Sequence, residues 1–110
     1  MENCLFCKII SGELPCEKVI ETSHYIAFKD IQPKAPVHVL IVPKRHVTRP
    51  EELREGEIHD ILLGSEEIGQ ILGVKETGYR LVFNVGLNAG QAVDHVHLHL
   101  LGGAPAKGMY

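Results

Sequence analysis

The sequence predicts an α+β fold with an antiparallel sheet, and three observations support this prediction. Short segments rich in β-branched and aromatic residues are separated by turn residues early in the chain. One long segment in the middle has apolar residues at helical spacing. Two further strand-like segments follow it, so helices and strands do not alternate as they do in parallel α/β proteins.

Turn and helix signals divide the chain into these elements. Gly12 is a favourable residue just beyond a helix end, and Pro50 is a favourable first helical residue. The apolar run VHVLIVP is typical of a central strand. In chain order the predicted elements are a short helix or turn at 4–11, strands at 17–21, 24–29 and 37–43, a long helix at 50–74, and strands at 79–85 and 95–101.

Composition and charge restrict the class of protein. The chain has 110 residues, of which 45% are hydrophobic and 23% charged, as expected for a single globular domain over residues 1–110. The net charge of −3 gives no overall positive field to attract nucleic acid or anionic lipid. No apolar stretch approaches the roughly 20 residues of a membrane helix, and the first ten residues do not resemble a secretory signal. We therefore expect a cytoplasmic protein with reduced cysteines and with neither nucleic-acid nor membrane partners.

Three histidines near the end of the chain form the clearest chemical signal. His95, His97 and His99 occupy alternate positions of a predicted strand, so their side chains share one face about 7 Å apart. The apolar residues between them point to the opposite face, toward the core. A shift of register by one residue would bury the histidines, so we expect the register to be strongly fixed.

Two functions fit this row of imidazoles. The rings can ligate a metal, as three-histidine zinc sites do. Alternatively, one ring attacks phosphorus while its neighbours bind a phosphate, because a pKa of about 6.5 leaves imidazole partly neutral and partly charged. The preceding loop, NVGLNAGQ at 84–91, favours phosphate, since its glycines let backbone N–H groups approach an oxyanion.

The cysteines give a weaker signal. Residues 4–7, CLFC, have the C-x-x-C spacing, which alone fits a redox pair, half of a metal site or coincidence. Cys16 has no evident partner in the sequence and is expected to be an ordinary free thiol.

Two motifs resemble those of the histidine triad (HIT) superfamily, in particular its Hint branch of nucleotide-binding phosphoramidases. HVHLHLLGG at 95–103, with its Gly-Gln lead-in, resembles the alternating histidine signature. DIQPKAPVHVLIVPKRH at 30–46 is an independent match, and the resemblance covers nearly the whole chain. It implies a five-stranded antiparallel sheet with two helices, and a homodimer whose strands form one ten-stranded sheet.

The resemblance also implies roles for individual residues. His97 would attack the α-phosphorus of a nucleoside phosphoramidate and form a nucleotidyl-histidine that water hydrolyses. Asp30 would bind the ribose hydroxyls, and Gln91 with the backbone amides of 89–93 would hold phosphate oxygens. The implied catalytic residues are His97, His99, His95 and His38. The implied nucleotide-binding residues are Asp30, Ile31, Asn84, Gly90, Gln91, Ala92, Val93, His97 and His99. The candidates for apolar walls of the base pocket are Phe6, Ile9, Ile26 and Phe28.

A metal site is implied as well. Some HIT members, and the related galactose-1-phosphate uridylyltransferases, combine C-x-x-C with a histidine after the central strand and with the first histidine of the row. The corresponding residues here are Cys4, Cys7, His46 and His95, two thiolates and two imidazoles for a tetrahedral structural zinc. No cofactor is expected to be required for catalysis itself.

The expected function is therefore hydrolysis of purine nucleoside phosphoramidates of the AMP-amine type. Purine nucleoside monophosphates and phosphoramidates are the expected ligands. Three alternatives remain: a dinucleoside polyphosphate hydrolase, as in the Fhit branch, a nucleotide-binding regulator with little turnover, and a metallohydrolase with zinc on all three histidines of the row. Ala92 stands where Hint members commonly have a serine that helps to protonate the leaving group, so slower amidate turnover is expected.

Overall fold

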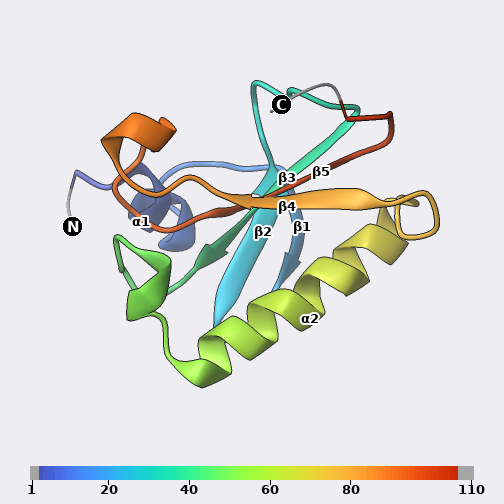
Figure 1. The fold of residues 1–110 in the computed structure, drawn as a ribbon. Helices are drawn as coiled ribbons and strands as arrows, with labels where there is room; N and C mark the ends of the chain where they lie inside the picture. Colours follow the sequence, from blue (N-terminus) through green and yellow to red (C-terminus); the bar gives the residue numbers. More distant parts are fainter. Residues whose placement is uncertain (1–2, 107–110) are drawn as a thin grey trace.

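A five-stranded antiparallel sheet forms the centre of the computed structural model, which describes residues 3–106 (Figure 1). The strands, in the spatial order β1-β2-β3-β5-β4, are β1 (Lys18–Glu21), β2 (Tyr25–Lys29), β3 (Val37–Pro43), β4 (Tyr79–Phe83) and β5 (Leu98–Gly102). The helices are α1 (Leu5–Ile10) and α2 (Glu55–Ile71), with short 3-10 helices at Pro50–Glu52 and Leu87–Ala89. The predicted α+β fold with five strands and two helices is confirmed. The predicted domain 1–110 also includes residues 1, 2 and 107–110, which lie outside the described residues.

The two faces of the sheet are covered by different helices. Along β2 and β3, alternate side chains point to opposite faces, as the period of a strand requires. One face carries Val39 and Ile41, which belong to the main core together with Ile61 and Ile68 of α2. The other face carries Leu40, which clusters with aromatic and aliphatic residues of α1 and β2. Because β3 is covered on both faces, its apolar run is fully explained.

Two glycines let α2 lie close to the sheet. A Cβ atom at Gly64 would collide with the hydroxyl group of Tyr25, and a Cβ atom at Gly69 would lie 2.9 Å from the Tyr79 ring. The cost of glycine within a helix is therefore offset by closer packing of α2 on β2 and β4.

The single helix predicted over 50–74 is wrong at its start. Pro50–Glu52 forms a separate 3-10 helix, Leu53 is extended with ψ 145°, and α2 begins only at Glu55. The Glu52 carboxylate accepts hydrogen bonds from the backbone N–H groups of Thr48 and Arg49, which closes the first turn on itself. Leu53, only 8% exposed, enters the core where the chain turns.

The strand predicted over 95–101 begins later than expected, at Leu98. The ladder with β3 ends at the pair Ile41–Leu98. Beyond it, Pro43 has no N–H to donate, and its carbonyl oxygen accepts a hydrogen bond from the His95 ring instead. The backbone N–H of Val96 donates to the carbonyl oxygen of Val47, so residues 95–97 bond to the segment after β3 and lie outside the regular sheet.

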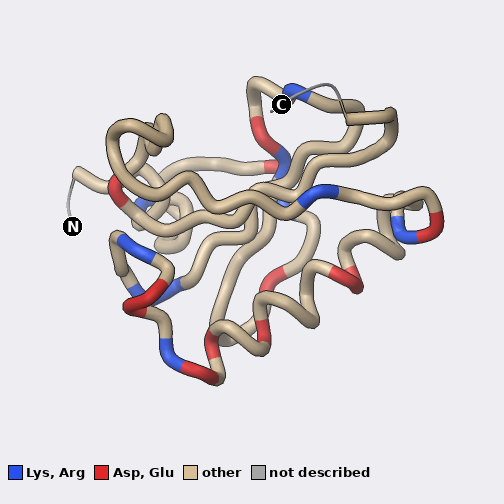
Figure 2. Tube along the Cα trace, viewed as in Figure 1, with Lys and Arg blue, Asp and Glu red and all other residues tan. Residues whose placement is uncertain are grey.

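Charged residues of both signs are interspersed over the described part of the chain, and several acidic residues lie along α2 (Figure 2). None of the described helices combines the length and the apolar composition needed to cross a bilayer.

Candidate functional site

His97 lies on the α1 face of the sheet, immediately before β5. The residue is 8% exposed, and its ring packs edge-on against Phe6 with the ring centroids 4.9 Å apart. Its Nδ1 atom lies 2.8 Å from the carbonyl oxygen of His95, and a carbonyl only accepts, so the ring proton is on Nδ1. The Nε2 atom therefore carries a lone pair, and within residues 3–106 it has no hydrogen-bond partner. Burial lowers the pKa of His97, which keeps the ring neutral at pH 7.

A chain of hydrogen bonds places the ring proton of His99 on Nε2, whereas that of His97 is on Nδ1. The backbone N–H of Lys34 donates to Nδ1 of His38 over 3.1 Å, so the proton of neutral His38 is on Nε2. That N–H donates to Nδ1 of His99 over 2.9 Å. The proton of His99 is therefore on Nε2, which lies 3.4 Å from the amide group of Asn84. The Asn84 atom at this distance is Nδ2, and because His99 Nε2 donates, the amide must rotate by about 180° about its last bond to present Oδ1 as the acceptor.

The electrostatic surroundings keep both of these rings neutral. Burial, followed by the neighbouring His97 and His38, lowers the pKa of His99 to about 4. Burial also lowers the pKa of His38, while Asp30 opposes this shift. The Asp30 carboxylate lies 3.4 Å from Nε2 of His38, and its other oxygen accepts the backbone N–H of Gln32 over 2.8 Å.

An apolar cavity of about 490 Å³ opens beside His97 and His99. Most of the residues predicted to bind a nucleotide line it: Asp30, Ile31, Asn84, Gly90, Ala92, Val93, His97 and His99. Of the predicted apolar walls, Phe6, Ile9 and Phe28 line the cavity. Ile26 belongs to the packed cluster beneath it and is not part of the wall. His38 stands behind His99 and lines a second cavity of about 230 Å³.

The glycine loop presents two free donors to the large cavity. The backbone N–H groups of Ala89, Gly90 and Gln91 are all used within the turn that they form. Those of Ala92 and Val93 have no hydrogen-bond partner within the described residues 3–106, and both residues line the cavity. Only these two amides of the predicted 89–93 set are therefore available to an oxyanion.

The Gln91 side chain holds this loop in place. Its Oε1 accepts the backbone N–H of Gly86 over 2.8 Å, and its Nε2 donates to the carbonyl oxygens of Thr48 and Val93. With these bonds formed, the side chain does not line the cavity, and its contribution is to fix the loop that carries the free amides.

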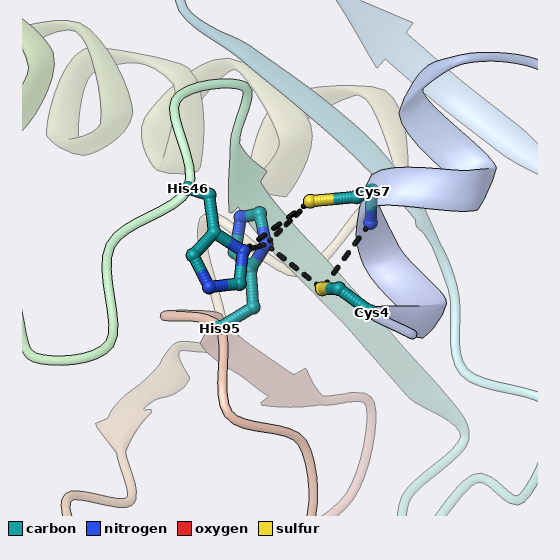
Figure 3. A group of neighbouring side chains, drawn as sticks. All are labelled: Cys4, Cys7, His46 and His95. Carbon is teal, nitrogen blue, oxygen red and sulfur yellow. Dashed lines mark hydrogen bonds between the residues drawn. The ribbon is translucent and has the colours of Figure 1, made fainter. Parts of the chain in front are cut away.

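Four potential metal ligands converge at the N-terminal end of α1: Cys4, Cys7, His46 and His95 (Figure 3). The Nδ1 atom of His95 lies 3.3 Å from Sγ of Cys4, 3.6 Å from Sγ of Cys7 and 3.1 Å from Nδ1 of His46. The Sγ atom of Cys7 lies 3.3 Å from Nδ1 of His46. Tetrahedral zinc, with bonds of about 2.3 Å to sulfur and about 2.0–2.1 Å to nitrogen, separates S and N by about 3.6 Å and two N atoms by about 3.3 Å. The four donor atoms predicted from the sequence therefore fit a zinc ion.

The proton on His95 also suits a metal ligand. Its Nε2 atom lies 2.8 Å from the carbonyl oxygen of Pro43, so Nε2 carries the proton and Nδ1 presents a lone pair to the cluster. His95 is fully buried, whereas Cys4, Cys7 and His46 are half-buried. His95 is buried in the observed register, which corrects the expectation that only a shift of register would bury the histidines.

Several contributors could not be expected from the sequence. The Lys34 amide and the Pro43 carbonyl act through the backbone, for which residue type gives no signal. Leu14 and Pro15 also line the large cavity, although nothing in their sequence context marks them. Leu40 could have been found, because it shares a strand face with His38.

The chain is similar in sequence and in fold to known proteins. Residues 11–106 match the HIT domain family. An uncharacterized HIT-like protein of Helicobacter pylori is 42% identical over 99 residues, covering 90% of this chain and 95% of that protein. The adenosine 5'-monophosphoramidase HNT1 of Candida albicans is 42% identical over 105 residues, covering 90% of this chain and 69% of that protein. The crystal structure of a HIT family hydrolase from Legionella pneumophila superimposes with a TM-score of 0.90 at 44% identity, covering 97% of this chain and 98% of that one.

Proposed function

This chain belongs to the HIT family, and we propose that it hydrolyses purine nucleoside phosphoramidates through a covalent intermediate on His97. The observation that carries the proposal is the lone pair on Nε2 of His97 beside the N–H on Nε2 of His99, at the wall of one cavity. The names of the Candida relative, a monophosphoramidase, and of the Legionella structure, a hydrolase, support the same reaction class.

The cavity has suitable partners for each part of a nucleotide. The apolar walls from α1, β2 and β3 suit a purine base, because a flat aromatic ring gains from burial against Phe6 and Phe28. The Asp30 carboxylate can accept hydrogen bonds from the ribose hydroxyls. The free amides of Ala92 and Val93, with the N–H of His99, can donate to the phosphate oxygens.

In the first step, Nε2 of His97 attacks phosphorus, the new N–P bond forms and the bond to the leaving amine breaks. The Nδ1–H of His97, held by the His95 carbonyl oxygen, stabilises the positive charge that develops on the ring. The departing amine takes a proton from water, because Ala92 offers no hydroxyl group. In the second step, water attacks phosphorus, the bond to His97 breaks and the nucleoside monophosphate is released.

The second cavity is suitably placed for the leaving group. Displacement at phosphorus places the leaving group opposite the nucleophile. The cavity of about 230 Å³ is lined by His99 and Asn84 but not by His97, so it is the proposed place for the leaving group. Its walls include Val82 and Leu101, with Lys34 as its cation.

We also propose that Cys4, Cys7, His46 and His95 hold zinc in a structural role. A complete set of four protein ligands leaves no open position for a substrate, so bound zinc would supply rigidity by joining α1 to the segment before β5. A cytoplasmic location would keep both thiols reduced and available to the metal.

A homodimer is the proposed assembly. β4 is an edge strand of the sheet, and it exposes Leu81 and Phe83, while α2 exposes Leu62 and Leu63. Pairing of β4 with a second copy would cover this edge and these apolar side chains. Light scattering should show a dimer for the wild type and a monomer for Leu81→Glu, and a monomeric wild type would contradict the assembly.

The activity is tested with a fluorogenic adenosine 5'-phosphoramidate and with diadenosine tetraphosphate, each before and after brief EDTA treatment. We expect hydrolysis of the amidate to survive EDTA and to fall at least about 10³-fold in His97→Asn. His59→Asn, at an exposed position of α2, is the matched control and should retain full activity. Unchanged activity in His97→Asn would refute the mechanism. Preference for the tetraphosphate would assign a different hydrolase activity, and nucleotide binding without turnover would favour a regulator.

A further inference from the structure

The short helix α1 joins the cysteine cluster to the nucleotide cavity. Cys4 caps the helix, and Cys7 lies on the side that faces the imidazoles of His46 and His95. Between them, Phe6 packs against the ring of His97 with centroids 4.9 Å apart, and it also lines the cavity. A change at the two sulfur atoms therefore acts on the wall that would contact the base.

We propose that Cys4 and Cys7 are a reversible oxidation site, and that a disulfide between them releases α1 and weakens nucleotide binding. The nucleotide part of this inference rests on the proposed function, whereas release of α1 does not. The oxidant is a hydroperoxide or a small disulfide.

The two sulfur atoms are close enough to join. All four donor atoms of the cluster lie within 4.8 Å of one another, and the backbone N–H of Cys7 already donates to Sγ of Cys4 over 3.4 Å. The C-x-x-C spacing across the first turn of a helix is compatible with disulfide geometry. A bond of about 2.05 Å would draw the sulfur atoms away from the imidazole nitrogens that they now face.

An open cleft gives an oxidant access to the cluster. The cleft has a volume of about 790 Å³ and is lined by Asn3, Cys4, Leu5, His46, Ala92, Val93 and Asp94. Cys4 is therefore reachable without passage through the core. The third thiol, Cys16, packs in the apolar cluster with Ile9 and Ile10 and is not part of this group.

The reaction balances with a hydroperoxide as the electron acceptor. The thiolate of one cysteine attacks the peroxide, which gives a sulfenic acid and releases water or an alcohol. The second thiol attacks that sulfur, the disulfide forms, and water leaves. A zinc ion held by the two thiolates would depart unchanged in oxidation state, because a disulfide sulfur has no negative charge with which to bind it.

The position of helix α1 depends on the contacts of Cys4 and Cys7 with His46 and His95. It has six residues, whereas isolated helices shorter than about 12–15 residues are marginal in water. After oxidation its remaining attachment is apolar packing, chiefly of Phe6 against Phe28 and the histidine rings. Loosening of this contact would open one wall of the cavity.

The test uses Cys16→Ser protein, so that only one disulfide is possible, in both metal-free and zinc-loaded form. After treatment with hydrogen peroxide we expect a mass decrease of about 2 Da, zinc release from the loaded form, and a rise of at least about fivefold in the Kd for AMP. Hydrogen exchange should accelerate at the amide of Lys8 in α1 and at those of Ser11 and Gly12, which follow α1 and donate to its last turn. Dithiothreitol, with zinc where it was present, should restore all of these values.

Cys7→Ser in the same background already lacks one proposed zinc ligand and cannot form the disulfide, so peroxide should change neither its AMP affinity nor its α1 exchange from that variant's own untreated values. The inference is overturned if peroxide and glutathione disulfide both fail to form the Cys4–Cys7 bond. It is equally overturned if the bond forms while AMP affinity and α1 exchange stay unchanged. If AMP binds in neither state but α1 still loosens, the proposed function fails and the oxidation site stands.

Discussion

Two pairs of histidines in this protein have nearly the same spacing and opposite proton arrangements. His46 and His95 have their Nδ1 atoms 3.1 Å apart, and His38 and His99 have ring nitrogens 2.9 Å apart. Each pair also belongs to a group of side chains that could hold a metal ion. Distance alone therefore does not separate their functions.

The backbone partners make the difference. The Pro43 carbonyl oxygen accepts a hydrogen bond from Nε2–H of His95, so the lone pair on Nδ1 faces two cysteine sulfur atoms and a second imidazole. The Lys34 amide instead donates to His38, so an N–H lies between His38 and His99. Converging lone pairs need a cation, whereas an N–H···N chain orients a donor. We therefore interpret the first pair as a metal site and the second as part of the catalytic machinery.

The largest expected effect comes from loss of the first site. Cys7→Ser removes one of the four proposed zinc ligands, and we expect stoichiometric zinc to be lost and Tm to fall by about 10 °C or more. Metal analysis and thermal unfolding measure both quantities. Cys16→Ser is the control, with zinc retained and Tm changed by less. An unaltered Tm in Cys7→Ser, with no zinc in the wild type, would remove the metal site from the comparison.

The second site is tested at His38. His38→Leu breaks the chain that orients His99, and we expect kcat for an adenosine phosphoramidate to fall about 10²-fold. His38→Gln keeps an oxygen that can accept the Lys34 amide and an N–H that can reach His99, so about tenfold of that loss should be recovered. Equal rates for the two variants would show that side-chain volume, and not the hydrogen-bonded chain, is what matters.

The pH dependence of the unfolding free energy tests whether the Arg45–Glu57 ion pair stabilises the segment that carries His46. Arg45 precedes His46, and its guanidinium hydrogen bonds lower the pKa of the buried Glu57 carboxylate to about 2. The folded-state pKa lies below the unfolded value, so the stabilisation is complete above about pH 4.5 and is lost as pH falls through 2. Glu57→Gln should lose about 1–3 kcal/mol of unfolding free energy at pH 7, discounted because Arg45 is partly exposed.

Denaturant titrations from pH 7 to pH 2.5 measure this difference. The difference in unfolding free energy between Glu57→Gln and the wild type should narrow below pH 4.5, and Glu55→Gln, at an exposed position two residues earlier, should show little change. A gap that stays constant with pH would show that the ion pair is not its source.

The smallest expected effect concerns protonation of the leaving amine near residue 92. Ala92→Ser places a hydroxyl next to the proposed phosphate position, and we expect kcat for amidates with poorly leaving amines to rise a few-fold, roughly 1 kcal/mol or less. A good leaving group should show no such gain. Acceleration of both substrates alike would point to a change in binding instead.

Sequence patterns predicted the fold well where side chains alternate between two environments. The apolar run of β3 and the histidine row before and within β5 specify which face each residue occupies, and both assignments agree with the structure. The break between Pro50–Glu52 and α2 was not predictable from apolar spacing, because it depends on the Glu52 carboxylate closing its own turn.

The residues of the candidate site could be predicted, but the ring nitrogen that carries the proton in each histidine could not. The resemblance to the HIT superfamily brought together the histidines, Asp30 and the glycine loop, and it also indicated the four side chains that could hold a metal ion. Which ring nitrogen carries a proton depends on backbone groups of Pro43, Lys34 and His95, and any residue type supplies a carbonyl. Gln91 likewise looked like a phosphate ligand, and its actual contacts became visible only with the loop folded.

Rapid-quench trapping of a single turnover tests the central claim most directly. Adenosine 5'-phosphoramidate labelled at the α-phosphate is mixed with excess enzyme and quenched in base, since an N–P bond to imidazole resists base and is labile to acid. The lone pair on Nε2 of His97 predicts transient label on the peptide that contains residues 95–99, and none in His97→Asn. Full turnover by the wild type with no protein-bound label at any time would contradict it.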